Sequence, residues 1–262
     1  MNVASTHPIL ATRDILGVPV LAATAGEAVA AIEARLARGE RIKLAFLNAH
    51  TSNLAAADDG FRTLLGDFTV LNDGVGVDLA SRVLHGERFP ENLNGTDFTP
   101  RLLAESKRPL RLFLLGARPG VADEAAAALL RLAPQHTIAG TRHGYFAPSE
   151  ATAVAAEIAA AKPDVLLVAL GNPGQERFIQ AQFDRLGVPL AIGVGALFDF
   201  LAGRVSRAPG WVRGLRAEWL YRLWREPKRL WRRYVLGNFK FISRLLWARA
   251  ARRRMPASAP LA

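Results

Sequence analysis

The sequence predicts an α/β fold, in which a Rossmann-like parallel sheet carries helices on both faces and is followed by a C-terminal basic amphipathic helical appendage. Two observations support this. Short apolar runs alternate with segments of helical apolar spacing from Lys43 to Gly195, a pattern typical of parallel sheets with crossover helices. From residue 204 onward the composition changes to Arg and Trp. We therefore expect an α/β body in residues 1–203, a basic appendage in 204–254 and a disordered tail in 255–262.

The expected strands are buried on both sides, because each reads as a nearly continuous apolar run. They are KLAFLN (43–48), FTVL (68–71), RLFLLG (111–116), DVLLVALG (164–171) and PLAIGVG (189–195). Helical spacing is found between them, at 53–65, from residue 75 onward, and at 121–132, 150–161 and 176–186. Residues 18–40 add a short strand and a strongly helical segment in front. With 262 residues, the chain is long enough to bury a substantial core.

Several classes of protein are excluded by composition. The chain has no cysteine, which rules out disulfides, thiolate metal sites and a cysteine nucleophile. Its five histidines show no ligand spacing, so we predict no structural zinc. The first residues lack the basic and apolar regions of a signal peptide. No apolar stretch approaches the roughly 20 residues that a membrane-spanning helix needs.

The net charge of +11 is concentrated in the appendage. Residues 204–254 hold 16 of the 34 Lys and Arg residues, two acidic residues, Glu218 and Glu226, and all five tryptophans. Two amphipathic helices are expected there, at 211–225 and 228–249, with Pro227 suited to the start of the second. Trp and Tyr beside Arg are typical of helices that lie in the lipid headgroup layer. We expect docking to an anionic membrane surface, with packing of some tryptophans against the body as the alternative.

Polar residues follow the strands, where a parallel sheet places them along one edge. In open α/β sheets this carboxyl edge binds ligands. The residues expected there are Asn48, His50 and Thr51 after the first strand, Asn72 and Asp73 after the second, Gly116 to Gly120 after the third, and Asn172, Gln175 and Glu176 after the fourth. We expect these side chains to converge on one site.

Each of these signals has a structural alternative. Asp73 precedes a helix, and Asp is a favoured helix cap, so from the residues alone capping is the preferred explanation. The glycines at 116–120 could cradle a phosphate at a helix N-terminus, yet tight turns need glycine without any ligand. Glu176 is explained by the helix dipole. Gln175 is not explained so easily.

Five motifs in a fixed order carry a resemblance to a known family. They are NDGVG (72–76), NGTDF (94–98), LLVALGNPGQE (166–176), GALFDFLAGRVSRAP (195–209) and EWLYRLWREPKRLWRRY (218–234). Together they resemble the WecG/TagA/CpsF glycosyltransferases of bacterial cell-surface polysaccharide synthesis, from about Lys43 to Asn238. Within that family the sequence is most similar to the glucosyltransferases of the GumM type, which act in exopolysaccharide synthesis.

The resemblance implies an activity. Family members transfer a sugar, with inversion, from a UDP-sugar to an undecaprenyl-diphosphate-linked sugar at the cytoplasmic face of the bacterial inner membrane, without a metal or other cofactor. The GumM-type resemblance implies UDP-glucose as the donor. The alternative donor is UDP-N-acetylmannosamine or its uronic acid. A peripheral membrane enzyme that binds no nucleic acid is therefore expected.

The resemblance also implies roles for individual residues. Asp73 matches the family aspartate proposed as general base, which reverses the preference for a cap. Asn48 matches a position near that aspartate, and Gln175 one that contacts substrate. Three appendage arginines match residues thought to reach the active site and the diphosphate. The full expected substrate-binding set is Asn48, Asn72, Asp97, Gly116, Asn172, Gln175, Glu176, Arg222, Arg229 and Arg232.

Two positions depart from the family pattern. Many members carry Pro-Glu-Arg where this chain has Pro90-Glu91-Asn92, so a cation is missing unless Arg88 replaces it. Many members also carry an acid where this chain has His50. Both departures argue against assigning N-acetylmannosamine as the donor without further data.

Two other classes of function fit parts of the sequence less well. Parallel strands with glycine turns fit a nicotinamide-dependent dehydrogenase, but no complete G-x-G-x-x-G with a following acid is present. A basic tail with aromatic residues fits a nucleic-acid-binding protein, which would show steep salt dependence without lipid preference.

Overall fold

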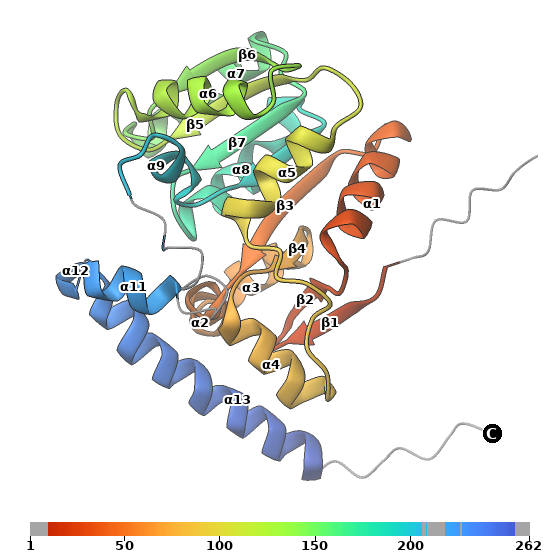
Figure 1. Ribbon diagram of the computed structural model, residues 1–262, viewed down its shortest axis with the longest axis vertical. Coiled ribbons are helices and arrows are strands. Elements are labelled where there is room, and N and C mark those ends of the chain that lie inside the picture. Colours follow the sequence, from red (N-terminus) through yellow and green to blue (C-terminus); the bar gives the residue numbers. More distant parts are fainter. Residues whose placement is uncertain (1–9, 206–207, 209–217, 226, 255–262) are drawn as a thin grey trace, which may run out of the picture.

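The computed structural model describes residues 10–205, 208, 218–225 and 227–254. It confirms the α/β fold: six parallel strands form one sheet in the order β4-β3-β8-β7-β5-β6, with helices on both faces (Figure 1). A separate antiparallel hairpin, β1-β2, precedes it. The strands are β1 (Thr12–Ile15), β2 (Val18–Leu21), β3 (Ile42–Leu47), β4 (Thr69–Asn72), β5 (Arg111–Gly116), β6 (Thr137–Arg142), β7 (Val165–Ala169) and β8 (Leu190–Gly193).

Two groups of helices cover the sheet, and each buries its own apolar cluster. On one face lie α1 (Ala25–Ala37), α5 (Gly95–Glu105), α6 (Val121–Leu132) and α9 (Leu197–Leu201). On the other lie α2 (Ala49–Ala57), α3 (Asp59–Gly66), α7 (Ala151–Ala160) and α8 (Gly174–Leu186), with α4 (Val75–His85) beside them and a short 3-10 turn at Pro148–Glu150. Alternate residues of the central strands enter the two clusters, as strand geometry requires.

The structure differs from the sequence prediction at the helix expected over residues 53–65 and at strand β6. The single helix expected at 53–65 is two helices, because Asp58 adopts an extended conformation and its side chain caps α3 by accepting from the Phe61 amide at 2.9 Å. Strand β6 was not predicted. It pairs with β5 alone at the sheet edge, and its residues are half-buried or exposed, so the apolar run that marks a central strand is absent.

The C-terminal segment is helical, as predicted, but is divided differently. It comprises α11 (Glu218–Arg225), α12 (Pro227–Trp231), a π-helical turn (Arg232–Leu236) and α13 (Gly237–Arg254). Residues 209–217, which begin the first expected helix, and the tail 255–262 lie outside the described residues. Helix α13, dark blue in Figure 1, runs along α2 and α4.

Helix α13 belongs to the packed structure through one of its faces. Phe241 and Leu245 are each 2% exposed and join the apolar cluster on the α2 side of the sheet. The Asn53 side chain donates to the Gly237 carbonyl at 2.7 Å and accepts from Arg244 at 2.6 Å. The boundary predicted at 203–204 stays a prediction, and the segment beyond it contributes to the core of the body.

Candidate active site

Asp73 and Asn48 meet at the carboxyl edge of the sheet. Asn48 directly follows β3, and Asp73 directly follows the neighbouring strand β4. The Asn48 side-chain amide donates to Oδ2 of Asp73 at 3.0 Å. The Asp73 backbone amide donates to the Leu47 carbonyl at 2.8 Å, which continues the pairing of the two strands past their ends. Asp73 is therefore held both through its carboxylate and through its backbone amide.

Asp73 is not the N-cap residue of α4. The helix begins at Val75, and its N-cap is Gly74, which makes no side-chain cap hydrogen bond. Asn48 does act as a cap: its Oδ1 accepts from the Thr51 amide at 3.0 Å at the start of α2. Asn48 thus uses its oxygen for α2 and its nitrogen for Asp73.

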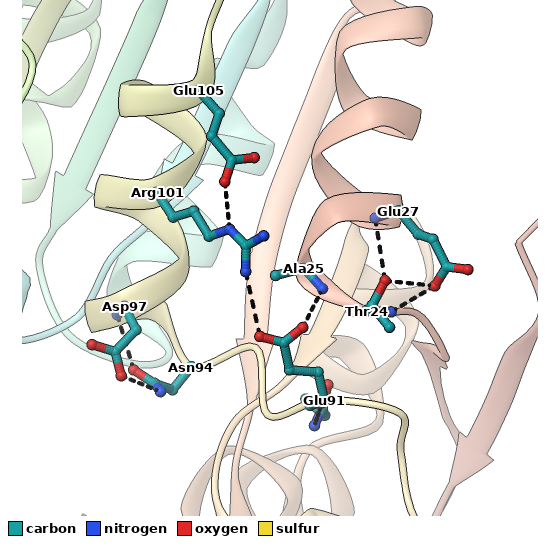
Figure 2. Close-up of polar contacts among 9 residues, drawn as sticks. Thr24, Ala25, Glu27, Glu91, Asn94, Asp97, Arg101 and Glu105 are labelled. Atoms are coloured by element: carbon teal, nitrogen blue, oxygen red, sulfur yellow. Dashed lines mark hydrogen bonds and ion pairs between the residues drawn. The ribbon is translucent and has the colours of Figure 1, made fainter.

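Residues 91 and 92 form hydrogen bonds with the loop that carries Asp73. The buried Asn72 side chain donates to the Glu91 carbonyl at 2.9 Å, and the Gly74 amide donates to Oδ1 of Asn92 at 2.8 Å. The Glu91 carboxylate in turn accepts from the Ala25 amide, at the start of α1, and faces Arg101 of α5 (Figure 2). Sequence reasoning did not identify this role, because each of the two hydrogen bonds joins a side chain to a backbone group of a distant loop.

A second polar cluster lies where β7 and β8 end. Oε1 of Glu176 accepts hydrogen bonds from the side chains of both Asn172 and Gln175. Oε1 of Gln175 accepts from the Gly195 amide at 3.0 Å, which ties the loop after β7 to the loop after β8. Gln175 and Glu176 are 2% and 0% exposed, so they lie under the sheet edge and not on an open rim.

Glu176 is electrostatically unusual. Burial raises the pKa of its carboxyl above the ordinary value, against the opposing effect of the hydrogen bonds from Gln175 and Asn172. Within the described residues, its Oε2 has no hydrogen-bond partner. A buried carboxyl with one free oxygen favours the protonated form, because the ionised form loses its hydration.

Gly116 has a structural explanation. Its φ of 137° is in the region that favours glycine, and a Cβ there would lie 2.4 Å from the Ala169 carbonyl oxygen of β7. The glycine is required by the close approach of β5 and β7. It follows that its presence gives no independent sign of a phosphate.

The remaining predicted residues lie around these clusters. Asp97 is exposed in the first turn of α5, where its Oδ2 accepts from Asn94 at 2.8 Å (Figure 2). His50 is half-buried in the first turn of α2. Arg88 forms a 3.5 Å ion pair with Asp78. The backbones of Arg222 and Arg229 are helical, in α11 and α12, but their side chains lie outside the described part of the structure, whereas the exposed Arg232 guanidinium lies 5.7 Å from the Trp231 ring centroid.

The strand order brings the two polar clusters to one edge. The strands β4, β3, β8 and β7 are consecutive neighbours, so the loops carrying Asp73, Asn48, Gly195 and Gln175 follow one another along the carboxyl edge. The edge thus offers one fixed, half-buried carboxylate, which suits proton abstraction. In the part of the chain that the structure describes, no group of three or more His, Asp or Glu side chains could hold a metal ion. Metal independence stays a prediction.

No helix among the described residues has the length and hydropathy needed to cross a bilayer.

Comparison with known proteins agrees with the motifs. Residues 13–255 match the family described as Glycosyl transferase WecG/TagA/CpsF family. An N-acetylglucosaminyldiphosphoundecaprenol N-acetyl-beta-D-mannosaminyltransferase of Bacillus subtilis (strain 168) is 38% identical over 178 residues, 68% of either chain. The enzyme of the same name from Bacillus spizizenii is 36% identical over 178 residues, 68% of this chain and 67% of its own. The chain therefore belongs to the WecG/TagA/CpsF family and is a glycosyltransferase.

Proposed function

We propose that the protein transfers an N-acetylmannosaminyl group from its UDP derivative to N-acetylglucosaminyl-diphospho-undecaprenol, with Asp73 as the general base. The observation that carries the choice of sugar and acceptor is the name shared by the two Bacillus relatives. These names favour the alternative donor of the sequence analysis over UDP-glucose. Family membership also argues against the dehydrogenase and nucleic-acid-binding alternatives.

The proposed reaction needs one base and a stabilised leaving group. The acceptor hydroxyl oxygen attacks the anomeric carbon while Asp73 takes its proton, the bond from that carbon to the β-phosphate oxygen breaks, and UDP departs. Attack opposite the leaving group inverts an α-linked donor to a β product, the configuration in the relatives' names. A single carboxylate held by Asn48 is sufficient for this step. We propose that Arg222, Arg229 and Arg232 neutralise the negative charge on the diphosphates, since Arg pairs well with phosphate.

The other expected binding residues divide into two groups under this proposal. Asn172, Gln175 and Glu176 hold the loops after β7 and β8 in place through their mutual hydrogen bonds. Asn72 supports the base loop, while Asp97 and the main chain at Gly116 line the edge beyond it. No metal or other cofactor takes part in the proposed mechanism.

We further propose that the enzyme docks peripherally on an anionic membrane, at the cytoplasmic face of the inner membrane. An acceptor carried on undecaprenol would be found there. Support comes from the outward face of α13, where Phe239, Ile242, Leu246 and Trp247 are exposed among Lys240 and Arg249. Exposed apolar and basic side chains on one helix are typical of binding in the headgroup layer.

The proposed donor and acceptor can be tested together. Purified enzyme is incubated with a water-soluble lipid-diphosphate N-acetylglucosamine acceptor and, separately, UDP-N-acetylmannosamine, its uronic acid, UDP-glucose and UDP-N-acetylglucosamine. Products are identified by mass spectrometry. We expect efficient transfer from UDP-N-acetylmannosamine alone. Preferential transfer of glucose would return the donor to the GumM-type expectation, and the absence of product with all four donors would contradict the proposed acceptor.

A further inference from the structure

Residues 91–92, here called the clamp segment, hold both neighbours of Asp73. The Glu91 carbonyl accepts from the Asn72 side chain, and the Asn92 side chain accepts from the Gly74 amide. The clamp segment is itself anchored, because the Glu91 carboxylate accepts from the Ala25 amide at 2.8 Å and lies 3.5 Å from the Arg101 guanidinium. A rigid connection therefore runs from the start of α1 to the loop that carries the proposed base.

Asn92 contributes a side-chain acceptor to the residue that directly follows Asp73. Gly74 is the N-cap residue of α4, with φ 90° and ψ 170°, and as a glycine it has no side chain with which to cap that helix. The amide needs an acceptor, and Oδ1 of Asn92 supplies it at 2.8 Å. Arginine carries only donors and cannot accept this hydrogen bond. The asparagine is thus chemically matched to the position that it occupies in this chain.

We propose that Asn92 is a positioning residue for the transfer reaction: by accepting from Gly74 it fixes the backbone on the C-terminal side of Asp73, while Asn48 fixes the carboxylate. This rests on the proposed role of Asp73 as base. Both neighbours of Asp73 are held by the clamp segment and its carboxylate by Asn48, so loss of one restraint changes the direction in which the carboxylate points. Misplacement of a reacting group by about 1 Å can lower a rate by about a hundredfold.

The test compares variants of the full chain at one position. Asn92→Ala removes the acceptor, Asn92→Asp keeps it, and Asn92→Arg replaces it with a donor. The control is Asp164→Ala, which also removes a side-chain oxygen that accepts a hydrogen bond from a backbone amide, that of Arg111, at 2.8 Å. Asp164 directly precedes β7, so it lies at the amino end of the strands, opposite the carboxyl edge. Steady-state kinetics with UDP-N-acetylmannosamine and the soluble acceptor, urea unfolding and amide hydrogen exchange at Gly74 are measured for each.

We expect Asn92→Ala and Asn92→Arg to lower kcat by about tenfold to a hundredfold with KM for both substrates nearly unchanged. Asn92→Asp recovers most of the lost rate. The Gly74 amide is expected to exchange faster in Asn92→Ala and Asn92→Arg than in the wild type, but not in Asp164→Ala. Asp164→Ala is expected to lower the free energy of unfolding without lowering kcat.

Three outcomes contradict the proposal. A wild-type kcat for Asn92→Ala removes the positioning role, and so does a wild-type kcat for Asn92→Arg, since arginine cannot accept from Gly74. A loss of stability with a normal rate per folded molecule leaves Asn92 a purely structural residue. An Asp73→Asn variant in the same assay distinguishes the positioning role of Asn92 from the base role of Asp73. If Asp73→Asn is inactive, any of the three outcomes above contradicts only the role of Asn92. If it is fully active, the base assignment fails, and the positioning role of Asn92 fails with it.

Discussion

Asn48 contacts Asp73 and caps helix α2 with the two ends of one side-chain amide. Its Nδ2 donates to Oδ2 of Asp73 at 3.0 Å, while its Oδ1 accepts from the Thr51 amide at 3.0 Å. The two functions are chemically distinct, because one requires a donor and the other an acceptor. Substitutions at residue 48 can therefore separate them.

Asn48→Asp should lower kcat while leaving stability nearly unchanged. Aspartate caps a helix as well as asparagine does, but it has no donor for the Asp73 carboxylate. Asn48→Ala should lose both functions, with a loss of about 1 kcal/mol in the free energy of unfolding. Urea denaturation and steady-state kinetics measure the two effects. Normal turnover by Asn48→Asp would show that the contact with Asp73 is dispensable.

Glu176→Gln should change stability in a pH-dependent way. Burial raises the pKa of the folded-state Glu176 carboxyl above its ordinary value, so its protonated form favours folding. That favourable contribution is complete below the ordinary pKa and is lost as the pH rises through the raised value. Glutamine does not titrate. The free energy of unfolding of Glu176→Gln, relative to the wild type, should therefore rise as the pH increases above the ordinary range of a glutamate.

Urea unfolding of both proteins between pH 4 and pH 8 tests this. A difference that is constant across the whole range would mean that the Glu176 carboxyl has the same pKa in the folded and unfolded chains.

Phe241→Ala should destabilise the body as well as α13. The ring is 2% exposed, and a Cβ on Gly76 would lie 3.7 Å from its Cε1 and 3.3 Å from the Ala49 Cβ, next to the starts of α2 and α4. Truncation of a buried Phe typically costs about 3–5 kcal/mol. Phe239→Ala is the control, because its side chain is 72% exposed on the same helix.

Denaturant midpoints for the two variants give the comparison. Equal midpoints would contradict the packing of α13 on the body. A chain ended near Ala202 loses Phe241 and Leu245 together, and we expect it to be less stable than the full chain for the same reason.

Trp247→Glu should weaken binding to anionic vesicles by about tenfold, because an exposed ring that contributes about 1.5 kcal/mol on burial is replaced by a repelled charge. Leu132→Glu is the control, since Leu132 is also exposed but lies on α6, away from α13. Sedimentation with vesicles that contain anionic lipid measures both. Equal binding by the two variants would exclude this face of α13 as the docking surface.

The parallel sheet was predictable because its strands are buried on both sides and read as continuous apolar runs. Strand β6 and the break at Asp58 escaped prediction for opposite reasons: the edge strand lacks such a run, and the capping residue interrupts a helical pattern that is otherwise unbroken. The helical character of the appendage was predictable. The packing of Phe241 and Leu245 into the body was not, since helical spacing does not specify the partner of an apolar face.

For the site, strand-end positions placed Asn48 and Asp73 together, because neighbouring parallel strands end at one edge. Gln175 and Glu176 were expected at the same edge for this reason, and the structure places them there but buries both side chains, with Gln175 bonded to the Gly195 amide. In the sequence, Asn92 stands out as a departure from a family motif. Its contact with the Gly74 amide depends on the path of a loop, which no local pattern encodes.

The central claim is that Asp73 removes the proton from the acceptor hydroxyl. The most direct test is turnover by Asp73→Asn, with UDP-N-acetylmannosamine and the soluble acceptor, beside UDP binding by calorimetry. Asparagine preserves the shape of the side chain but cannot take up the proton, so we expect the rate to fall by about 10²- to 10⁴-fold with UDP binding nearly unchanged. A rate within a few-fold of the wild type would contradict the assignment of Asp73 as the base.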